Sequence, residues 1–600
     1  MGSPVAETLL ERALAAYQRG DPASCASALD ADPDAWIGRA DGWLVRGVAA
    51  RALGRVAEAE ASYRHAIALH AEFPEAWQNL GNLLAATGRQ AEAVEAYRRA
   101  LALRADARER AALLILIAGS AFSAGLIDDA LTAMNEAVAL DPASAGAHNQ
   151  RGKVLWELGH TDAAIDAFRR AQSCDPANPL YATNGLLVSQ FAEGLTEADL
   201  ASLARIAASR IAAEVPVALK DGFRMPGPTA DGRLRIAYLS SDFRATAPGF
   251  FIRAILAGHD RQRFDVWALS TSGGMDDWSG KLRSHVDQWH DVAGLGTVAL
   301  TEWIRANGIQ VLVDLNGYTG GHRLGVFAAR AAPVQVSWLG YEGTTGLPGM
   351  DAILGDPAVT AVETESCYSE AVHRLPFDFA CYWAPDYAPE VAPLPAATAG
   401  RITFGSFNKL AKLGRGTLAL WARVLHAVPD SRLLLKWRHA THAFARERIL
   451  GELAAHGVAA GRVEFRDASP HADMLMEYGD VDIALDPFPF SGGATTCDAL
   501  WMGVPVVTLQ GQRFASNHTV SHLRAAGLPE LVATSPIEYV EICRRLSADL
   551  RGLGRLRATL REQLRHSPLC EHTLFMRPAE RILESLWAQR LGTPKTFAGS

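Results

Sequence analysis

The first third of the chain repeats a pattern of small and aromatic positions. The segments that start at Trp43 and Trp77, WLVRGVAARALGRVAEAEASYRHAIAL and WQNLGNLLAATGRQAEAVEAYRRALAL, align at an offset of 34 residues. Later copies carry the matching positions Ala130, Met134, Ala137 and Pro142 and, 34 residues on, Ala164, Phe168, Ala171 and Pro176. Small residues let two helices approach, an aromatic ring fills the gap between hairpins, and proline ends a helix. The pattern therefore predicts a stack of helical hairpins.

A 34-residue period held over several copies resembles the tetratricopeptide repeat. Residues 9–33 are interpreted as a degenerate first copy and residues 178–191 as a capping helix. Stacked repeats of this kind form a concave surface that holds a peptide or protein. The alternative is a scaffold that serves only dimerisation or stability.

After the repeats, short apolar runs alternate with helical stretches. The runs are LRIAYLS, RFDVWALS, IQVLVDLNG, PVQVSWLG, ITFGSFN, SRLLLKW, RVEFR, VDIALD and PVVTL, and 418–427 and 442–456 are two of the helical stretches between them. Buried strands that alternate with helices predict a parallel sheet covered on both faces. Ligands of such sheets bind beyond the carboxyl ends of the strands.

Two stretches rich in Pro, Gly or Ala divide the chain further. We expect a repeat superhelix over 1–180, a helical linker over 181–232, a first lobe over 233–390 and a second lobe with C-terminal helices over 391–600. The Pro- and Gly-rich end of 197–232 and the Pro- and Ala-rich stretch 384–400 mark the last two boundaries. The predicted shape of the second part is two doubly wound lobes with a cleft between them.

Composition narrows the class of protein. The 600 residues (64.4 kDa) are 49% hydrophobic and 21% charged, which is typical of a globular chain and excludes a mostly disordered one. The net charge of −8 gives no reason to expect nucleic acid as a partner. No apolar run reaches the 18 or so residues of a membrane span. Seven scattered cysteines without a CxxC suit a reducing cytoplasm and disfavour a zinc site or a disulfide framework.

Five blocks carry a resemblance to a known family. They are IAYLSSDF, LVDLNGYTGGHRLGVFAARAAPVQVSWLGYEGTTGLPGMD, YSEAVHRLP, SFNKLAKL and DIALDPFPFSGGATTCDALWMGVPVVTL. In this order they resemble the catalytic region of the O-linked N-acetylglucosamine transferases, glycosyltransferase family 41, to which the plant SPINDLY proteins and bacterial relatives belong. The resemblance implies a GT-B fold of two Rossmann-like lobes. It also implies an inverting protein O-glycosyltransferase of the hexosyltransferase class, which uses a UDP-linked sugar, modifies Ser or Thr and needs no metal or other cofactor.

On the donor side, the resemblance assigns Lys412 to the diphosphate of the donor. Lys409 replaces the usual Asn or Gln and adds a second positive charge there. The loop SGGATTCDALW opens a helix, and its donor-binding candidates are Gly492, Gly493, Thr495, Thr496 and Asp498. Glycines permit close backbone approach, and a helix N-terminus with hydroxyl groups suits phosphate. The resemblance assigns Asp498 to the ribose hydroxyls. Taken alone, the loop is equally a glycine-rich turn with a capped helix.

On the acceptor and sugar side, Asn316 and Thr319 of DLNGYTGG match family positions. Thr344 and Thr345 belong to another cleft loop, in which Glu342 replaces the customary proline. Asp242 of SSDF follows a strand, where a helix cap and a catalytic role are equally good interpretations.

At three positions the sequence departs from the family pattern in ways that concern the catalytic base. Relatives usually carry His where this chain has Thr246, and Thr is no base near pH 7. A second family His aligns with Met474, near His471, and a family Arg aligns with Asn517, which precedes His518. An inverting transfer needs the acceptor hydroxyl deprotonated. The candidates are His322, His518 and Asp242, together with Lys412 in the catalytic set, unless the donor phosphate takes the proton.

Alternative functions stay open at this point. Asp480 and Asp482 form a DxD pair, but it begins a buried strand and is interpreted as structural. The chain is expected to bind a protein acceptor through its repeats and a nucleotide sugar in its cleft, and it could form a homodimer. The sugar could instead be fucose or a nonulosonic acid on a substrate such as flagellin, or the chain could be a catalytically weak scaffold. Retention of Lys412, Thr495 and Asp498 favours an enzyme.

Overall fold

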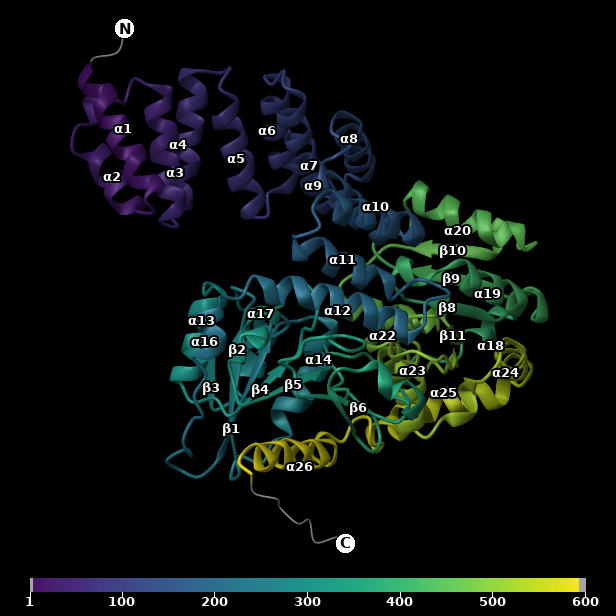
Figure 1. Ribbon diagram of the computed structural model, residues 1–600. Coiled ribbons are helices and arrows are strands. Elements are labelled where there is room, and N and C mark those ends of the chain that lie inside the picture. The colour runs from purple at the N-terminus through teal and green to yellow at the C-terminus, as the bar shows by residue number, and fades with distance from the viewer. Residues whose placement is uncertain (1–3, 593–600) are drawn as a thin grey trace. The chain divides into compact units, whose positions relative to one another are not determined.

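The repeat region folds as successive helical hairpins (Figure 1). The computed structural model describes residues 4–592. The hairpin helices are α1 Pro4–Gln18, α2 Pro22–Asp30, α3 Ala40–Ala52, α4 Val56–Leu69, α5 Pro74–Ala86, α6 Gln90–Ala102, α7 Ala107–Ser123, α8 Ile127–Leu140, α9 Ala145–Glu157 and α10 Thr161–Cys174. The predicted hairpins, including the degenerate first copy, are confirmed.

The predicted contact between a small and an aromatic residue packs the α3–α4 and α5–α6 hairpins. A Cβ atom at Gly47 would lie 2.5 Å from the ring of Tyr63, and one at Gly81 would lie 2.6 Å from the ring of Tyr97. Each ring therefore occupies the space that a side chain on the facing helix would need. The spacing of the repeats is not uniform, because Met134 follows Tyr97 by 37 residues and the 17-residue α7 takes up the extra length.

Contacts within the chain group it into two units. One comprises Met1–Leu155 with Asp166–Asp175, and the other comprises Trp156–Ile165 with Pro176–Ser600. The turn between α9 and α10 therefore belongs with the second unit, ahead of the expected boundary at residue 180. The reason is local bonding: Thr161 Oγ1 donates to the Ala411 carbonyl at 3.1 Å.

The first lobe is built on a parallel sheet in the order β3-β2-β1-β4-β5-β6-β7. Its strands are β1 Leu234–Ser240, β2 Phe264–Ser270, β3 Gln288–Asp291, β4 Val311–Asp314, β5 Val334–Trp338, β6 Ala352–Gly355 and β7 Ala371–Arg374. The strand order reverses between β1 and β4, which pair in parallel (Ile236 with Val311). Loops after these two strands therefore meet at a topological switch point.

Alternate residues of β1 enter two different cores. Ala237 and Leu239 pack against α12 (Glu197–Ala213) and α11 (Pro179–Ser189). Ile236 and Tyr238 pack against α14 (Ala247–Ala257) and α26 (His572–Arg590). Figure 1 shows α12 and α26 along opposite sides of this lobe. The other helices after the repeats and before the second sheet are α13 Val217–Asp221, α15 Asp277–Arg283, α16 Thr297–Ala306, α17 Leu324–Ala328 and α18 Ala396–Ala399.

The position of α26 differs from the expected domain division. We expected all C-terminal helices in the second lobe, 391–600, but Phe575, Met576 and Leu583 lie in the core of the first lobe. Helix α26 shares this core with α14, so both helices pack on the same face of the first sheet. The interpretation of 178–191 as a capping helix of the repeats also changes, since α11 pairs with α12 and contributes to the first-lobe core.

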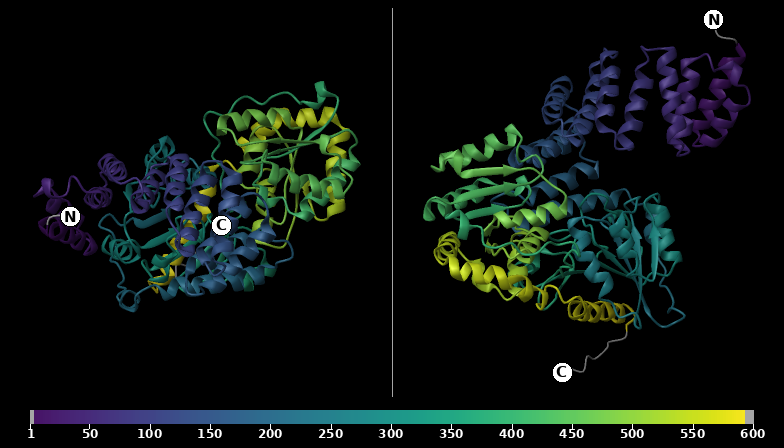
Figure 2. Two further views of the ribbon diagram at one scale, coloured as in Figure 1. Left: turned by 90° about the horizontal axis from the view of Figure 1, so that it is seen from above. Right: turned by 180° about the vertical axis from the view of Figure 1, so that it is seen from behind.

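The second lobe holds a parallel sheet in the order β10-β9-β8-β11-β12-β13. Its strands are β8 Thr403–Ser406, β9 Arg432–Lys436, β10 Val463–Arg466, β11 Ile483–Leu485, β12 Val506–Leu509 and β13 Val532–Ala533. Its helices are α19 Arg415–Ala427, α20 Ala443–Ala455, α21 His471–Glu477, α22 Ala494–Trp501, α23 His518–Ala525, α24 Pro536–Ala548 and α25 Leu550–Arg565. Figure 2 shows the sheet of each lobe flanked by helices. The order reverses between β8 and β11, which gives a second switch point.

The predicted fold class is thus confirmed: helical repeats precede two doubly wound lobes of the GT-B type. Among the described residues, none of the helices combines the length and apolar character that a bilayer crossing requires.

Candidate active site

Lys412 lies at the switch point of the second sheet. It ends the short 3-10 turn Leu410–Lys412, which follows β8. Its Nζ donates to the Ser491 carbonyl at 2.6 Å and lies 4.4 Å from the ring centre of Phe490. Burial lowers the pKa of this lysine to about 8, although the carboxylates of Asp486 and Glu342 act in the opposite direction. A desolvated ammonium group of this kind is suited to a negatively charged ligand.

A pocket of about 260 Å³ surrounds Lys412, and both lobes of the second unit line it. The first lobe contributes Ala247, Pro248, Phe251, Leu339, Glu342, Phe379 and Ala380. The second lobe contributes Asn408, Lys409, Lys412, Trp437, Phe490, Gly493, Ala494, Thr495, His518 and His522. The cleft expected between the lobes is therefore present, and aromatic side chains form much of its wall.

Lys409 lines the same pocket but already has partners. Its Nζ lies 2.5 Å from Glu157 Oε1 and 3.6 Å from the ring centre of Trp156. Both partners belong to the end of α9 that is grouped with the second unit. The structure thus brings the two predicted lysines together, with Lys412 the less engaged of the two.

The predicted phosphate loop is divided between the pocket and the interior. Gly493 and Thr495 line the pocket at the start of α22. Gly492 is held below it, because its N–H donates to Asp486 Oδ1 at 2.7 Å. The hydroxyl of Thr496 is buried against a threonine hydroxyl of α23 at 2.8 Å.

Asp498, predicted to bind ribose, is a buried residue with two side-chain partners. Its Oδ1 accepts a hydrogen bond from the Tyr382 hydroxyl at 2.6 Å, and its Oδ2 lies 3.1 Å from His471 Nε2. His471 Nδ1 in turn lies 2.8 Å from the Tyr387 hydroxyl. Asp498 does not line the pocket. A ribose at this site would have to displace His471, the more exposed partner.

The first-lobe candidates gather at the other switch point. Asn316 Nδ2 donates to Asp242 Oδ2 at 3.0 Å and to Thr319 Oγ1 at 3.2 Å, and Asn316 Oδ1 accepts from the Ser241 N–H at 2.7 Å. Burial raises the pKa of Asp242, and hydrogen bonds from Thr246 and Asn316 act against that shift. This cluster joins the loops after β1 and β4, outside the lining of the pocket.

In the loop after β5, Glu342 faces the cleft and the two threonines that we expected there do not. The hydroxyl of Thr344 donates to Glu370 Oε2 at 2.6 Å, and Thr345 donates to Glu370 through both its hydroxyl and, at 2.7 Å, its N–H. Both threonines are buried and shape the loop. Glu342 lines the pocket instead. The sequence held a signal for it, namely an acidic residue in a glycine-rich loop where relatives have proline.

Of the predicted histidines, only His518 reaches the pocket. Burial, together with the charge of Lys412, lowers its pKa well below the usual value. His322 lies outside the lining, and burial lowers its pKa to about 4. His522, which sequence analysis gave no role, lines the pocket and places Nδ1 2.7 Å from Asp378 Oδ2. Thr246 caps α14 by accepting the Gly249 N–H at 3.3 Å.

The DxD pair has structural contacts. Asp482 is fully buried, and its two oxygens accept the N–H groups of Ala396 and Thr403 at 2.9 and 2.8 Å. Asp480 pairs with Arg466 at 2.7 Å.

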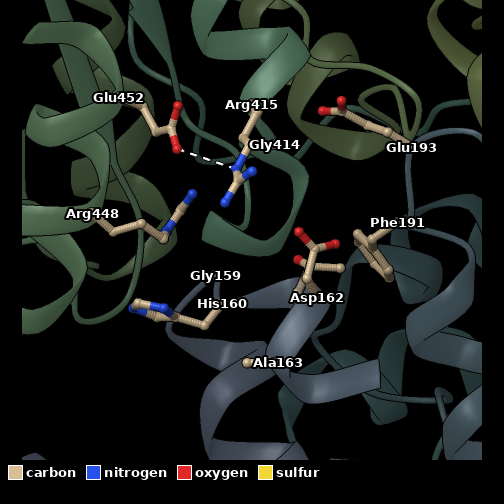
Figure 3. A pocket seen from close by; sticks show the side chains of 11 residues that line it. Gly159, His160, Asp162, Ala163, Phe191, Glu193, Gly414, Arg415, Arg448 and Glu452 are labelled. Atoms are coloured by element: carbon tan, nitrogen blue, oxygen red, sulfur yellow. Dashed lines mark ion pairs between the residues drawn. The ribbon is translucent and has the colours of Figure 1, made fainter. Parts of the chain in front are cut away.

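A second pocket, also of about 260 Å³, adjoins the segment that follows the Lys412 turn, since Gly414 and Arg415 line it (Figure 3). Its walls come from 159–163, Phe191, Glu193, Gly414, Arg415, Arg448 and Glu452, all in the second unit. Arg415 and Glu452 form an ion pair at 3.2 Å in it. Arg448 donates to the carbonyls of Leu413 at 2.9 Å and Leu410 at 3.4 Å. Together with the hydrogen bond from Thr161 to the Ala411 carbonyl, these bonds hold the turn in place.

Comparisons with known proteins agree with this architecture. The profile of "Glycosyl transferase family 41" matches residues 197–386 and 394–577, and a tetratricopeptide repeat profile matches 44–108 and 116–179. The "Probable UDP-N-acetylglucosamine--peptide N-acetylglucosaminyltransferase SPINDLY" of Solanum lycopersicum is 38% identical over 359 residues, which is 59% of this chain. The corresponding SEC protein of Arabidopsis thaliana is 29% identical over 391 residues, or 62% of this chain.

This chain matches only part of each plant protein: the alignments span 39% and 38% of their lengths. A solved structure, that of a mutant O-GlcNAc transferase of Thermobaculum terrenum, matches more completely. It is 31% identical with a TM-score of 0.74, and the match covers 92% of this chain and 98% of that one. By both sequence profile and fold, the chain belongs to glycosyltransferase family 41.

Proposed function

We propose that this chain is a protein O-glycosyltransferase that moves a sugar from a UDP-linked donor to Ser or Thr hydroxyls, with inversion. The observation that carries the proposal is Lys412, a desolvated ammonium group in an interlobe pocket at a sheet switch point. Cleavage of a sugar–diphosphate bond places negative charge on the leaving phosphate. A preorganised cation in a dry site stabilises that charge.

The neighbouring groups suit the same ligand. The backbone at Gly493 and the N-terminus of α22 offer N–H donors, and Thr495 adds a hydroxyl group. We propose that these groups hold the diphosphate without a metal ion, and that Asp498 binds the ribose once His471 moves aside. The sugar then lies toward the first lobe, with N-acetylglucosamine as the expected sugar from the names of the relatives.

The repeats would supply the protein substrate. Stacked repeats of this type present an extended surface that suits a peptide or protein ligand, and we propose that they hold the acceptor. We further propose that the reaction takes place in the cytoplasm. We also propose that the chain can form a homodimer, which a measurement of mass in solution tests.

The donor can be tested with a panel of nucleotide sugars. We would measure thermal shift and nucleotide release with UDP-N-acetylglucosamine, GDP-fucose and a CMP-nonulosonate, using the full chain and the Lys412→Ala variant. We expect UDP-N-acetylglucosamine to stabilise the wild type and to release UDP, and the variant to show neither effect. A response only to the GDP or CMP donor would replace the proposed sugar. No response to any donor would favour the scaffold function.

A further inference from the structure

Glu342 is the polar side chain that the first lobe contributes to the pocket. The other first-lobe residues lining it are Ala247, Pro248, Phe251, Leu339, Phe379 and Ala380, all apolar. Lys412 faces Glu342 from the second lobe, near enough that each charge shifts the pKa of the other group. We propose that Glu342 is the general base that accepts the proton of the attacking hydroxyl, an inference that rests on the proposed function.

The carboxylate of Glu342 is available, while the rest of its loop is fixed. The backbone carbonyl of Glu342 accepts from Gln190 Nε2 at 3.2 Å, and Gln190 also donates to the Tyr341 hydroxyl at 3.0 Å. Thr344 and Thr345 are tied to Glu370. In the described part of the chain, the Glu342 carboxylate receives a hydrogen bond only from its own backbone N–H. A rigid loop therefore presents an acceptor-only group to the cleft.

An inverting attack favours Glu342 over the two histidines that line the pocket. The hydroxyl must attack the anomeric carbon on the face opposite the leaving phosphate, so base and phosphate-binding cation lie on opposite sides of the sugar. His518 and His522 come from the same lobe as Lys412, and the charge of Lys412 lowers the pKa of His518. Glu342 comes from the opposing lobe. Thr246, at the position of the family histidine, is committed to capping α14.

In the proposed transfer, one bond to the anomeric carbon forms as another breaks. The acceptor oxygen forms a bond to the anomeric carbon as the bond from that carbon to the diphosphate oxygen breaks. The bonding electron pair leaves with the nucleoside diphosphate. The hydroxyl proton passes to Glu342 and then to solvent. Lys412 stays protonated throughout and offsets the charge on the phosphate.

The charges around Glu342 predict the pH dependence. Lys412 and Lys409 face it from the turn after β8, His518 and His522 from α23, and Glu197 lies near Gly343 on α12. Burial raises the pKa of Glu342 to about 7, and Lys412, with a pKa of about 8, partly opposes that shift. A base must be deprotonated and a phosphate-binding lysine protonated. We therefore expect kcat/KM to rise through about pH 7 and to fall above about pH 8.

The test compares Glu342→Gln with the full wild-type chain, with UDP-N-acetylglucosamine as donor and water as acceptor. Glu363→Gln, an exposed carboxylate of the same lobe, is the matched control. We expect Glu342→Gln to lower kcat for UDP release by about a hundredfold or more. The Kd for UDP should stay within about threefold of wild type, because the diphosphate contacts remain. The rising limb of the pH profile should disappear.

A second variant distinguishes the loss of a proton acceptor from a distortion of the pocket. Glu342→Ala leaves space, so added formate should restore part of its rate, while Glu342→Gln should not respond. Glu342→Gln with wild-type kcat, or with an unchanged pH profile, would overturn the assignment and leave the proposed function standing. A wild-type chain that releases nucleotide from no donor would overturn the proposed function itself, and this inference with it.

Discussion

Two opposite charges, Lys412 and Glu342, face a shared pocket without forming an ion pair among the described residues. Burial moves both pKa values toward neutrality, to about 8 for the lysine and about 7 for the glutamate. A direct pair would neutralise both groups and hold them in one geometry. Kept apart, each remains able to interact with a ligand, one with a phosphate and the other with a proton.

Lys412→Ala should abolish transfer while the fold stays intact. The variant removes the cation nearest the proposed diphosphate, and loss of one such donor typically costs about a hundred- to a thousandfold in kcat. Nucleotide release and circular dichroism measure the two effects. Because burial of the ammonium group is itself unfavourable, the melting temperature should not fall. Wild-type activity in this variant would contradict the assignment of Lys412.

Thr246→Ala should have a small effect on rate and a measurable effect on stability. The hydroxyl of Thr246 accepts the Gly249 N–H at the start of α14, and loss of such a cap costs about 1 kcal/mol. Chemical denaturation and the kcat for nucleotide release are the measurements. A drop in kcat beyond a hundredfold, about 2.7 kcal/mol of barrier, would show that this position takes part in the reaction.

Residue types predicted the site better than they predicted side-chain direction. The sequence predicted that Lys412, Gly493 and Thr495 lie at the cleft, and all three line the pocket. The fold fixes where the backbone lies after a strand, so such positions can be predicted. It placed Thr344 and Thr345 in the cleft, yet their hydroxyls bind Glu370 in the interior. Which way a loop side chain turns depends on a partner 25 residues away, and no local pattern reports such a partner.

At the scale of elements, the α3–α4 and α5–α6 hairpins each contain one close contact between a glycine and an aromatic ring. Gly81→Ala places a methyl group 2.6 Å from the ring of Tyr97, and this overpacking should destabilise the repeat unit by about 1–3 kcal/mol. Gly119→Ala is the matched control, since its Cβ would lie 3.6 Å from its nearest neighbour and a helical alanine is favoured by about 0.5–1 kcal/mol. In chemical denaturation, we expect the free energy of unfolding to fall for Gly81→Ala and to rise for Gly119→Ala. Equal effects would mean that the ring does not fill that space.

The turn that carries Lys412 depends on elements outside the pocket. Arg448 in α20 and Thr161 in α10 donate to three of its carbonyls. Arg448→Met should remove the side-chain bonds to the Leu413 and Leu410 carbonyls, of which Leu410 keeps the Leu413 N–H as a donor, and loosen the turn. We expect UDP to bind about tenfold more weakly, with little change in the rate at saturating donor. Isothermal titration with UDP is the measurement, and unchanged affinity would show that the turn holds its own shape.

The strands predicted from the sequence are those that lie in recognisable apolar runs. These runs identified β1, β2, β4, β5 and β8–β12, most of which are buried on both faces. Four strands were missed. The edge strands β3 and β7 are short and partly exposed, with sequences QWHD and AVHR that show no apolar run. The edge strand β13 has two residues, and β6 is buried but only four residues long.

At the scale of the whole molecule, the two units should respond separately to nucleotide. A ligand that binds only the native second unit stabilises it by about 2.7 kcal/mol at a hundred times its Kd. Scanning calorimetry with and without UDP should therefore shift one of two transitions, and Lys412→Ala should abolish that shift. A single transition that moves as a whole would show that the repeats and lobes unfold together.

The division of the chain into repeats and two lobes could be predicted from sequence because each part has its own period. The exact boundaries could not, since they depend on contacts distant in sequence. The turn at 156–165 belongs with the lobes through its bonds to Lys409 and Ala411. Helix α26 belongs with the first lobe although more than 190 residues separate it from β7.

That return of α26 sets an order for biosynthesis. The face of the first sheet that carries Ile236 and Tyr238 is covered by α14 early, but its contacts with α26 cannot form until residues 572–590 have left the ribosome. At the usual 5–20 residues per second, the interval between β7 and α26 is roughly 10–40 s. A newly made first lobe therefore exposes the part of its apolar core that α26 covers for that time.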